Sequence, residues 1–136
     1  MCIDSPASAE DGIISRERSH PRAWASTARI LGYYVRELKL ITLEEAIRKM
    51  TSLPAFRMRL GDQGLLRPEM AADIVAFSSD SVGDRSTYAD PNHYGQGFEY
   101  MAINRELVVD GGKITNARPG RPLFGPGSRS RLPPDR

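Results

Sequence analysis

Apolar residues recur at helical spacing in the first half of the chain. Five of them fall on one helical face: Ile30, Leu31, Tyr34, Val35 and Leu38. This pattern predicts a helix over residues 27–39, with Ser26 or Thr27 as its N-cap. The stretch TLEEAIRKM predicts a second helix, because Thr42 and Glu45 are spaced as in a capping box, where each side chain bonds the other residue's backbone N–H. The stretch PAFRM predicts a short third helix, since proline is tolerated in a first helical turn.

The second half of the chain changes to strand patterns. Residues 73–77 are an apolar run, which predicts a short strand buried on both faces. The stretch GFEYMAIN predicts a second strand, and ELVVD and KIT flank Gly111 and Gly112 as in a hairpin. A polar loop of about twenty residues separates the first two strands, and loops of that length usually carry function or contact another segment. These few helices and short strands leave exposed strand edges and a poorly covered sheet face.

Composition narrows the functional classes. The 136 residues include a single cysteine, Cys2, so no intrachain disulfide forms and a reducing compartment is indicated. His20 and His93 are the only histidines, too few with one cysteine for a complete catalytic zinc site. The sequence has neither an apolar run of the ~20 residues that span a bilayer nor a secretory signal. We therefore expect a cytoplasmic protein without membrane contact.

The basic excess of the chain lies in its C-terminal tail. The net charge is +2, and residues 118–136 hold five arginines against one aspartate. Five prolines and three glycines in the same segment favour an extended tail with little to bury. A basic tail attracts phosphate-rich partners, but Phe124 is its only aromatic residue, so nucleic-acid binding is not expected.

Several stretches together resemble a known family. The motifs are HPRAW, EEAIRKMTSLPA, GLLRPEMAADIVAF and VVDGGKITNARPGR, within residues 19–121. They are similar to the C-terminal part of the N-acyl-D-amino-acid deacylases (D-aminoacylases), members of the metal-dependent amidohydrolase superfamily. These enzymes pair a (β/α)8 barrel with a small β-sandwich built from both chain ends.

The resemblance implies a fold class and a domain division. The fold is expected to be an α/β fragment, or α+β when isolated. Residues 1–60 would be the end of the barrel, with its last strand at residues 1–4, followed by a loop and helices. Residues 61–117 would be strands of the small β domain, and residues 118–136 the basic tail. A complete barrel takes about 250 residues, which this chain does not have.

The resemblance also implies a catalytic residue. Asp4 in CIDS matches the family aspartate that ends the eighth strand and shuttles a proton between metal-bound water and the leaving amine. Asp11 in EDG competes for this role but lacks an apolar strand before it. From the residues alone, Asp4 is more readily a solvated loop acid or a helix cap. The zinc ligands of the family lie on strands that this sequence does not contain, so zinc is implied for the parent enzyme and none for this chain alone.

The HPR motif supplies the expected substrate-binding residues. Arg22 matches a family arginine that binds the substrate carboxylate, a task suited to a planar guanidinium that donates two parallel hydrogen bonds. His20 precedes it in the same motif, and from the residues alone it is a structural loop histidine. The motif departs from the family pattern after Arg22, where Trp24, Ala25 and Ala28 replace tyrosine, glycine and proline. We read His93 and Tyr94 in DPNHYGQG as structural.

Three functions remain open at this stage. The first is the C-terminal part of a zinc-dependent enzyme that hydrolyses the amide of N-acyl-D-amino acids, inactive as this chain alone. The second is a non-catalytic remnant or interaction module that needs a complementary chain or associates with itself. The third is a cyclic-amide hydrolase of the same superfamily, which the carboxylate-binding arginine disfavours.

Overall fold

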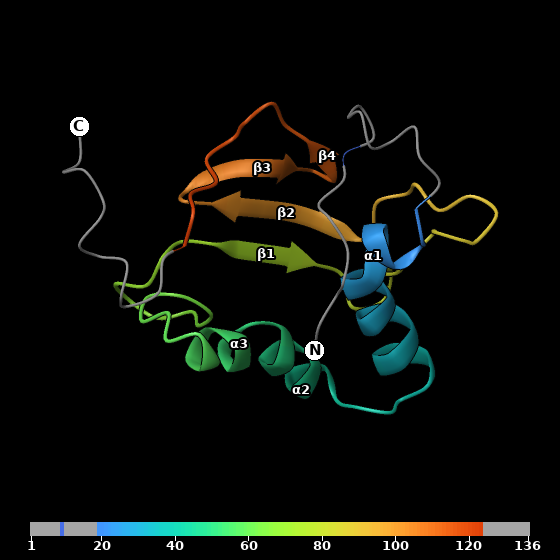
Figure 1. Ribbon diagram of the computed structural model, residues 1–136, viewed down its shortest axis with the longest axis horizontal. Coiled ribbons are helices and arrows are strands. Elements are labelled where there is room, and N and C mark those ends of the chain that lie inside the picture. Colours follow the sequence, from blue (N-terminus) through green and yellow to red (C-terminus); the bar gives the residue numbers. More distant parts are fainter. Residues whose placement is uncertain (1–8, 10–18, 124–136) are drawn as a thin grey trace.

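A computed structural model of the chain describes residue 9 and residues 19–123. Within these residues four helical segments come first: α1 (Arg22–Arg29), η2 (Ile30–Glu37), α2 (Leu43–Met50) and α3 (Ser52–Arg57). Four strands follow: β1 (Ile74–Phe77), β2 (Phe98–Ile103), β3 (Glu106–Asp110) and β4 (Lys113–Ile114). Figure 1 shows the helices grouped together beside a single sheet. This separation is the α+β arrangement predicted for the isolated chain.

The first helix begins earlier than predicted. It starts at Arg22 rather than at residue 27, and Pro21 stands at the N-cap, so the prediction that Ser26 or Thr27 caps it is wrong. Ser26 instead lies inside the helix, where its hydroxyl donates to the carbonyl of Arg22 at 2.7 Å. A proline at a helix start is itself a start signal, because its missing N–H costs nothing there.

The first helical region also changes its winding. The backbone of Ala25 departs from helical angles, with φ of −138°, and marks a kink in α1. From Ile30 to Glu37 the chain forms a π-helix, which ends with the N–H of Leu38 donating to the carbonyl of Tyr33 at 2.9 Å. Such wide turns are rare and recur at functional sites.

The predicted capping box of α2 is half present. The Thr42 hydroxyl accepts the backbone N–H of Glu45 at 3.2 Å, as predicted. The Glu45 carboxylate, however, accepts two hydrogen bonds from Arg48, at 2.6 and 2.9 Å, rather than returning to Thr42. The bonds from Arg48 and the nearby Lys49 lower the pKa of Glu45 to about 2. Because these groups are exposed, the pairing contributes little to stability.

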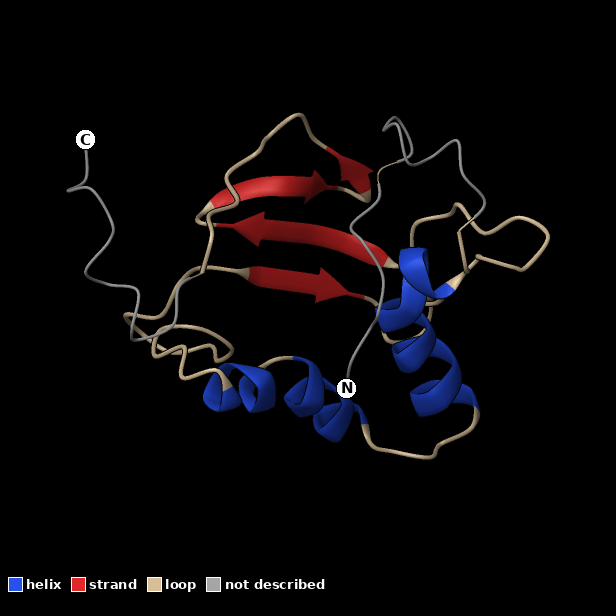
Figure 2. Ribbon diagram, viewed as in Figure 1, coloured by secondary structure: helices blue, strands red, loops and turns tan. Residues whose placement is uncertain are grey.

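The strands form an antiparallel sheet in chain order, β1-β2-β3-β4 (Figure 2). The Asp73 carboxylate joins its first two strands, because it accepts the N–H of Asn104 at 2.8 Å. The β3–β4 hairpin is confirmed, with Gly111 and Gly112 both at positive φ, 53° and 76°. Glycine suits this two-residue turn because it adopts positive φ without a steric cost.

The prediction that β1 is buried on both faces is wrong. Ile74 and Val75 are 43% and 47% exposed. Among the described residues β1 pairs only with β2, so it is an edge strand of the sheet. An apolar edge strand with exposed side chains is a surface suited to contact with further polypeptide.

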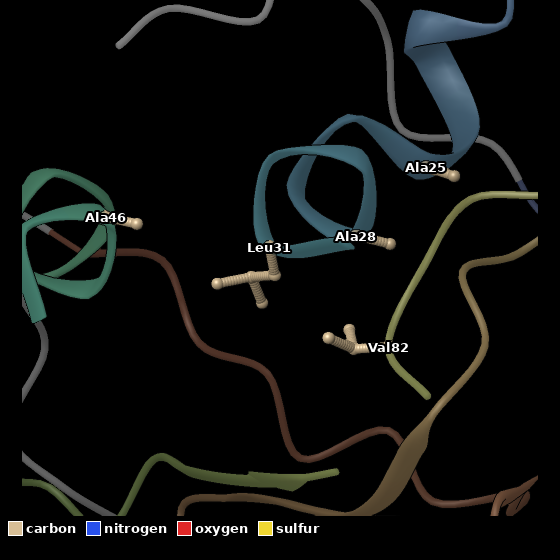
Figure 3. Packing of buried hydrophobic residues seen from close by; sticks show 5 residues of the cluster. All are labelled: Ala25, Ala28, Leu31, Ala46 and Val82. Carbon is tan, nitrogen blue, oxygen red and sulfur yellow. The ribbon is translucent and has the colours of Figure 1, made fainter. Parts of the chain in front are cut away.

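The buried core is small and rich in alanine (Figure 3). The buried cluster has members on α1, η2 and α2 and one member, Val82, in the loop of residues 78–97. These residues are Ala25, Ala28, Leu31, Ala46 and Val82. Val82 is 1% exposed and packs beside Gly32, whose place a larger residue could not take, since an added Cβ would lie 2.5 Å from the Val82 carbonyl. The loop therefore packs directly on the helices.

The β2–β3 turn offers a stabilising substitution. Asn104 and Arg105 both adopt positive φ, 48° and 70°, and the second position of such turns favours glycine. A left-handed conformation costs a non-glycine residue about 1 kcal/mol. We expect Arg105→Gly to raise the free energy of unfolding by about that amount, measured by urea denaturation. The opposite change, Gly112→Ala at φ of 76°, is the matched control and should lower it similarly; an unchanged Arg105→Gly midpoint would contradict the turn geometry.

Candidate functional site

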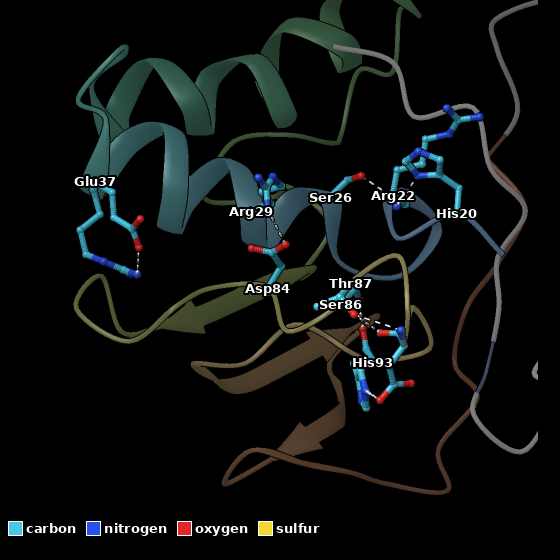
Figure 4. Close-up of polar contacts among 11 residues, drawn as sticks. His20, Arg22, Ser26, Arg29, Glu37, Asp84, Ser86, Thr87 and His93 are labelled. Carbon is cyan, nitrogen blue, oxygen red and sulfur yellow. Dashed lines mark hydrogen bonds and ion pairs between the residues drawn. The ribbon is translucent and has the colours of Figure 1, made fainter. Parts of the chain in front are cut away.

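The segment of residues 19–24 starts α1 and carries two of the predicted site residues. The first turn is closed by the His20 carbonyl, which accepts the N–H of Ala23 at 2.9 Å, and by the Pro21 carbonyl, which accepts that of Trp24 at 3.2 Å. Arg22 is the first residue of the helix, and its backbone N–H donates to Nδ1 of His20 at 3.1 Å. The structure therefore brings His20 and Arg22 together in one turn, as Figure 4 shows.

The Arg22 side chain is exposed at this turn. Among the described residues no acidic side chain pairs with its guanidinium. Two other arginines differ in this respect, because Arg29 donates to Asp84 at 2.9 Å and Arg36 donates to the carbonyls of Ser79 and Val82. The hydrogen bond to Asp84 raises the pKa of Arg29 above its usual value. Arg22 is thus a cation that the described part of the chain leaves available to an external anion.

The loop of residues 78–97 folds back onto the start of α1. Tyr88, which is 80% exposed, places its hydroxyl 3.3 Å from Nε2 of His20, and the two rings meet edge to face with centroids 5.2 Å apart. A second contact joins the Trp24 ring to that of Tyr94, with centroids 5.5 Å apart. The Trp24 indole N–H also donates to the Ser19 hydroxyl at 2.8 Å. Loop and helix start therefore form one structural unit.

The interior of this loop is held by its own hydrogen bonds. His93 lies 2.6 Å from the Asp90 carboxylate through Nε2, and its carbonyl accepts the buried Ser86 hydroxyl at 2.9 Å. The Thr87 hydroxyl accepts the N–H of Asp90 at 3.0 Å. Gly83 and Gln96 exchange backbone hydrogen bonds and close the loop at its base. His93 is thus occupied by contacts within the loop (Figure 4).

Two sequence-predicted residues fall outside this geometry. Asp4 and its competitor Asp11 lie outside the described residues. The described residues also fail to fit a metal ion, because residues 9 and 19–123 contain no group of three or more His, Cys, Asp or Glu side chains placed to hold one. His20 and His93 have different partners, Tyr88 and Asp90.

An apolar groove of about 560 Å³ lies between the helices and the sheet. Helix residues form one side and strand residues the other, among them Trp24, Leu31, Met50, Val75, Phe98 and Met101. Such a groove is suited to apolar side chains or an apolar ligand. Within the described part of the chain, no helix is long and apolar enough to cross a membrane.

Sequence reasoning missed Tyr88 as a partner of His20. The two residues are far apart in the chain, and the polar loop between the strands carries no periodic pattern from which the contact could be inferred. The only available signal was the length of that loop, which indicated contact with another segment. The start of α1 had a clearer signal, the proline directly before Arg22.

Comparison with known proteins finds a matching family and related sequences. The model of the amidohydrolase family matches residues 5–115. The chain is 42% identical over 113 residues to N-acyl-D-glutamate deacylase of Alcaligenes xylosoxydans xylosoxydans, an alignment that covers 83% of this chain. It spans 23% of that relative's length.

Two solved structures are similar to the chain. One is N-acyl-D-glutamate deacylase from Bordetella bronchiseptica, complexed with zinc and a phosphonate inhibitor, at 41% identity and a TM-score of 0.66. The match covers 69% of this chain and 21% of that one. The other is a D-aminoacylase mutant in complex with CuCl2, at 36% identity and a TM-score of 0.76. That match covers 79% of this chain and 23% of the other.

Proposed function

The chain belongs to the amidohydrolase family, and from this we propose that it forms the C-terminal part of an enzyme that hydrolyses the amide of N-acyl-D-amino acids. Its relative from Alcaligenes xylosoxydans xylosoxydans is an N-acyl-D-glutamate deacylase, and the chain corresponds to about a quarter of that protein. In this proposal residues 1–60 end the barrel of the parent enzyme and residues 61–117 belong to its small β domain. Residues 118–136 form a basic tail.

The exposed guanidinium of Arg22 carries the proposal. An N-acyl-D-amino acid presents an α-carboxylate beside the amide to be cleaved, and a carboxylate is the ligand that the fork of an arginine binds best. Arg22 lies at the first residue of α1, and no described acidic residue neutralises it. Its role is to hold the substrate by the carboxylate, so that the amide is oriented for attack.

The second proposed role is proton transfer by Asp4. A carboxylate beside the attacking water takes a proton from it and passes that proton to the nitrogen of the leaving amine. His20 completes the proposed substrate-binding motif with Arg22. The described residues do not fit a zinc site, so no step is assigned to a metal held by them, and the metal ligands of the parent enzyme are proposed to lie on the remaining part.

A second candidate function is an interaction module that requires a complementary chain. The exposed apolar residues of β1 and the apolar groove favour it, because both present surface that further polypeptide could cover. The same surface is expected if the chain completes a parent enzyme, so the two candidates differ in activity rather than in binding. A cyclic-amide substrate, the third alternative, need not carry a free carboxylate, so the proposed role of Arg22 disfavours it.

Complementation separates these candidates. The part of the Alcaligenes N-acyl-D-glutamate deacylase that this chain does not match is produced as a separate polypeptide and mixed with the 136-residue chain. We expect a one-to-one complex by analytical ultracentrifugation that hydrolyses N-acetyl-D-glutamate, whereas neither polypeptide alone does. The relative's own C-terminal quarter serves as the positive control.

The other outcomes of this experiment are equally informative. A complex that forms without hydrolysis, while the positive control is active, favours the interaction module. Hydrolysis by the 136-residue chain alone would contradict the proposed division of the site. Self-association of the chain without binding to the added polypeptide would contradict the proposal that it completes a deacylase.

A further inference from the structure

We propose that His20 is a positioning residue for Arg22, acting as a neutral imidazole that carries its proton on Nε2. The inference rests on the proposed function for the role of Arg22, and on the geometry of the turn for the role of His20. In this inference the HPR motif has two separate roles: Arg22 binds the carboxylate, and His20 fixes the backbone of Arg22.

The tautomer of His20 follows from its first contact. The backbone N–H of Arg22 donates to Nδ1 at 3.1 Å, and a nitrogen that accepts a hydrogen bond must keep its lone pair. The proton of a neutral ring then resides on Nε2. Nε2 faces the Tyr88 hydroxyl at 3.3 Å, so the ring donates to the phenol oxygen and both nitrogens have a partner.

The start of α1 explains why the ring is needed. The first N–H groups of a helix have no partner within the helix, and a side-chain oxygen at the N-cap usually accepts one of them. Here the N-cap is Pro21, which has no such oxygen. His20 replaces it, since its ring accepts the N–H of Arg22 and its carbonyl accepts that of Ala23 at 2.9 Å.

The contact with Tyr88 extends the effect to the loop of residues 78–97. The ring of His20 is held from one side by the helix start and from the other by a residue of the loop. The edge-to-face packing, with ring planes at 77°, restricts the ring further. Arg22 is therefore attached to a backbone that two separate chain segments fix, which reduces the ordering required when it binds a carboxylate.

The tautomer is measured on the 136-residue chain itself. Ring 15N shifts at pH 8 are expected to show a protonated Nε2 and an unprotonated Nδ1 for His20. In His20→Leu the Arg22 amide should exchange with solvent much faster, because it loses its acceptor. In His20→Asn it should remain protected, because an asparagine oxygen accepts the N–H two residues on. A protonated Nδ1, or equal exchange in His20→Leu and the unchanged chain, would overturn the inference.

The functional consequence is measured in the complemented enzyme. His20→Leu is expected to raise KM for N-acetyl-D-glutamate roughly five- to tenfold with little change in kcat, and His20→Asn should largely restore it. His93→Asn, which alters a histidine of the loop that does not contact Arg22, is the matched control and should leave KM unchanged. An equal rise in all three variants would overturn the positioning role. Failure of complementation by the unchanged chain would refute the proposed function, while the 15N and exchange measurements would still decide the role of His20.

Discussion

Gly97→Ala is expected to lower the free energy of unfolding by about 3 kcal/mol, combining overpacking with a left-handed backbone. Gly97 has φ of 82°, a region that alanine rarely adopts. An added Cβ would lie 2.5 Å from both the nitrogen and the Cα of Val82, which are backbone atoms and cannot rotate away. Because Val82 belongs to the small buried core, its displacement would also disturb the packing of the loop on η2. Urea denaturation followed by circular dichroism measures the loss.

Two further glycines separate the causes of this effect. Gly111 has positive φ, but no atom lies near the position that an added Cβ would take. Gly111→Ala should therefore lower the free energy of unfolding by about 1 kcal/mol, from the backbone conformation alone. Gly61 has neither a close atom nor positive φ, so Gly61→Ala should leave stability within about 0.5 kcal/mol. If Gly97→Ala is no worse than Gly111→Ala, the close approach to Val82 is not present in solution.

Arg22→Ala in the complemented enzyme is expected to reduce kcat/KM for N-acetyl-D-glutamate roughly 100-fold. In the proposed role of Arg22, this change would remove a charge-assisted bidentate contact to the substrate carboxylate, and no described residue offers a replacement cation in the same turn. Arg22→Lys retains the positive charge without the planar fork and should lose roughly tenfold. Steady-state kinetics with saturating and subsaturating substrate separate the rise in KM from any change in kcat.

The control for this substitution is Arg57→Ala. Arg57 is an exposed arginine near the end of α3, with no acidic partner among the described residues, so its removal changes the net charge by the same amount. It should leave kcat/KM unchanged. If both variants lose activity equally, Arg22 acts through overall charge rather than as a specific carboxylate ligand.

Features set by a few adjacent residues could be predicted from the sequence. Thr42 does cap α2, because its hydroxyl and the N–H of Glu45 are brought together by the local backbone. Gly111 and Gly112 do form the β3–β4 turn, because the turn depends on their own φ angles. The second predicted bond of the capping box, from the backbone N–H of Thr42 to the Glu45 carboxylate, does not form, because that carboxylate accepts from Arg48 instead.

Features that depend on distant contacts could not be predicted in this way. An apolar run such as residues 73–77 indicates a strand that favours burial, but the pattern does not identify the segment that would cover it. In this chain β1 is exposed. The candidate site shows the same division. Arg22 was proposed from its motif and its role stays a prediction, whereas the contact of His20 with Tyr88 arises only when the long loop folds back onto α1. The role of Asp4 stays a prediction.

The alanine-rich core has a consequence for the evolution of this chain. Ala25, Ala28, Ala46 and Ala55 are each 6% exposed or less, and each has little side-chain volume to lose. Random mutation at these sites therefore mostly enlarges a residue, and enlargement in a packed interior is destabilising. A deep mutational scan should find them as intolerant as a ligand-binding position, because of their burial alone. Among homologous genes, invariance at these alanines would record a limit on space and should not be read as a sign of catalysis.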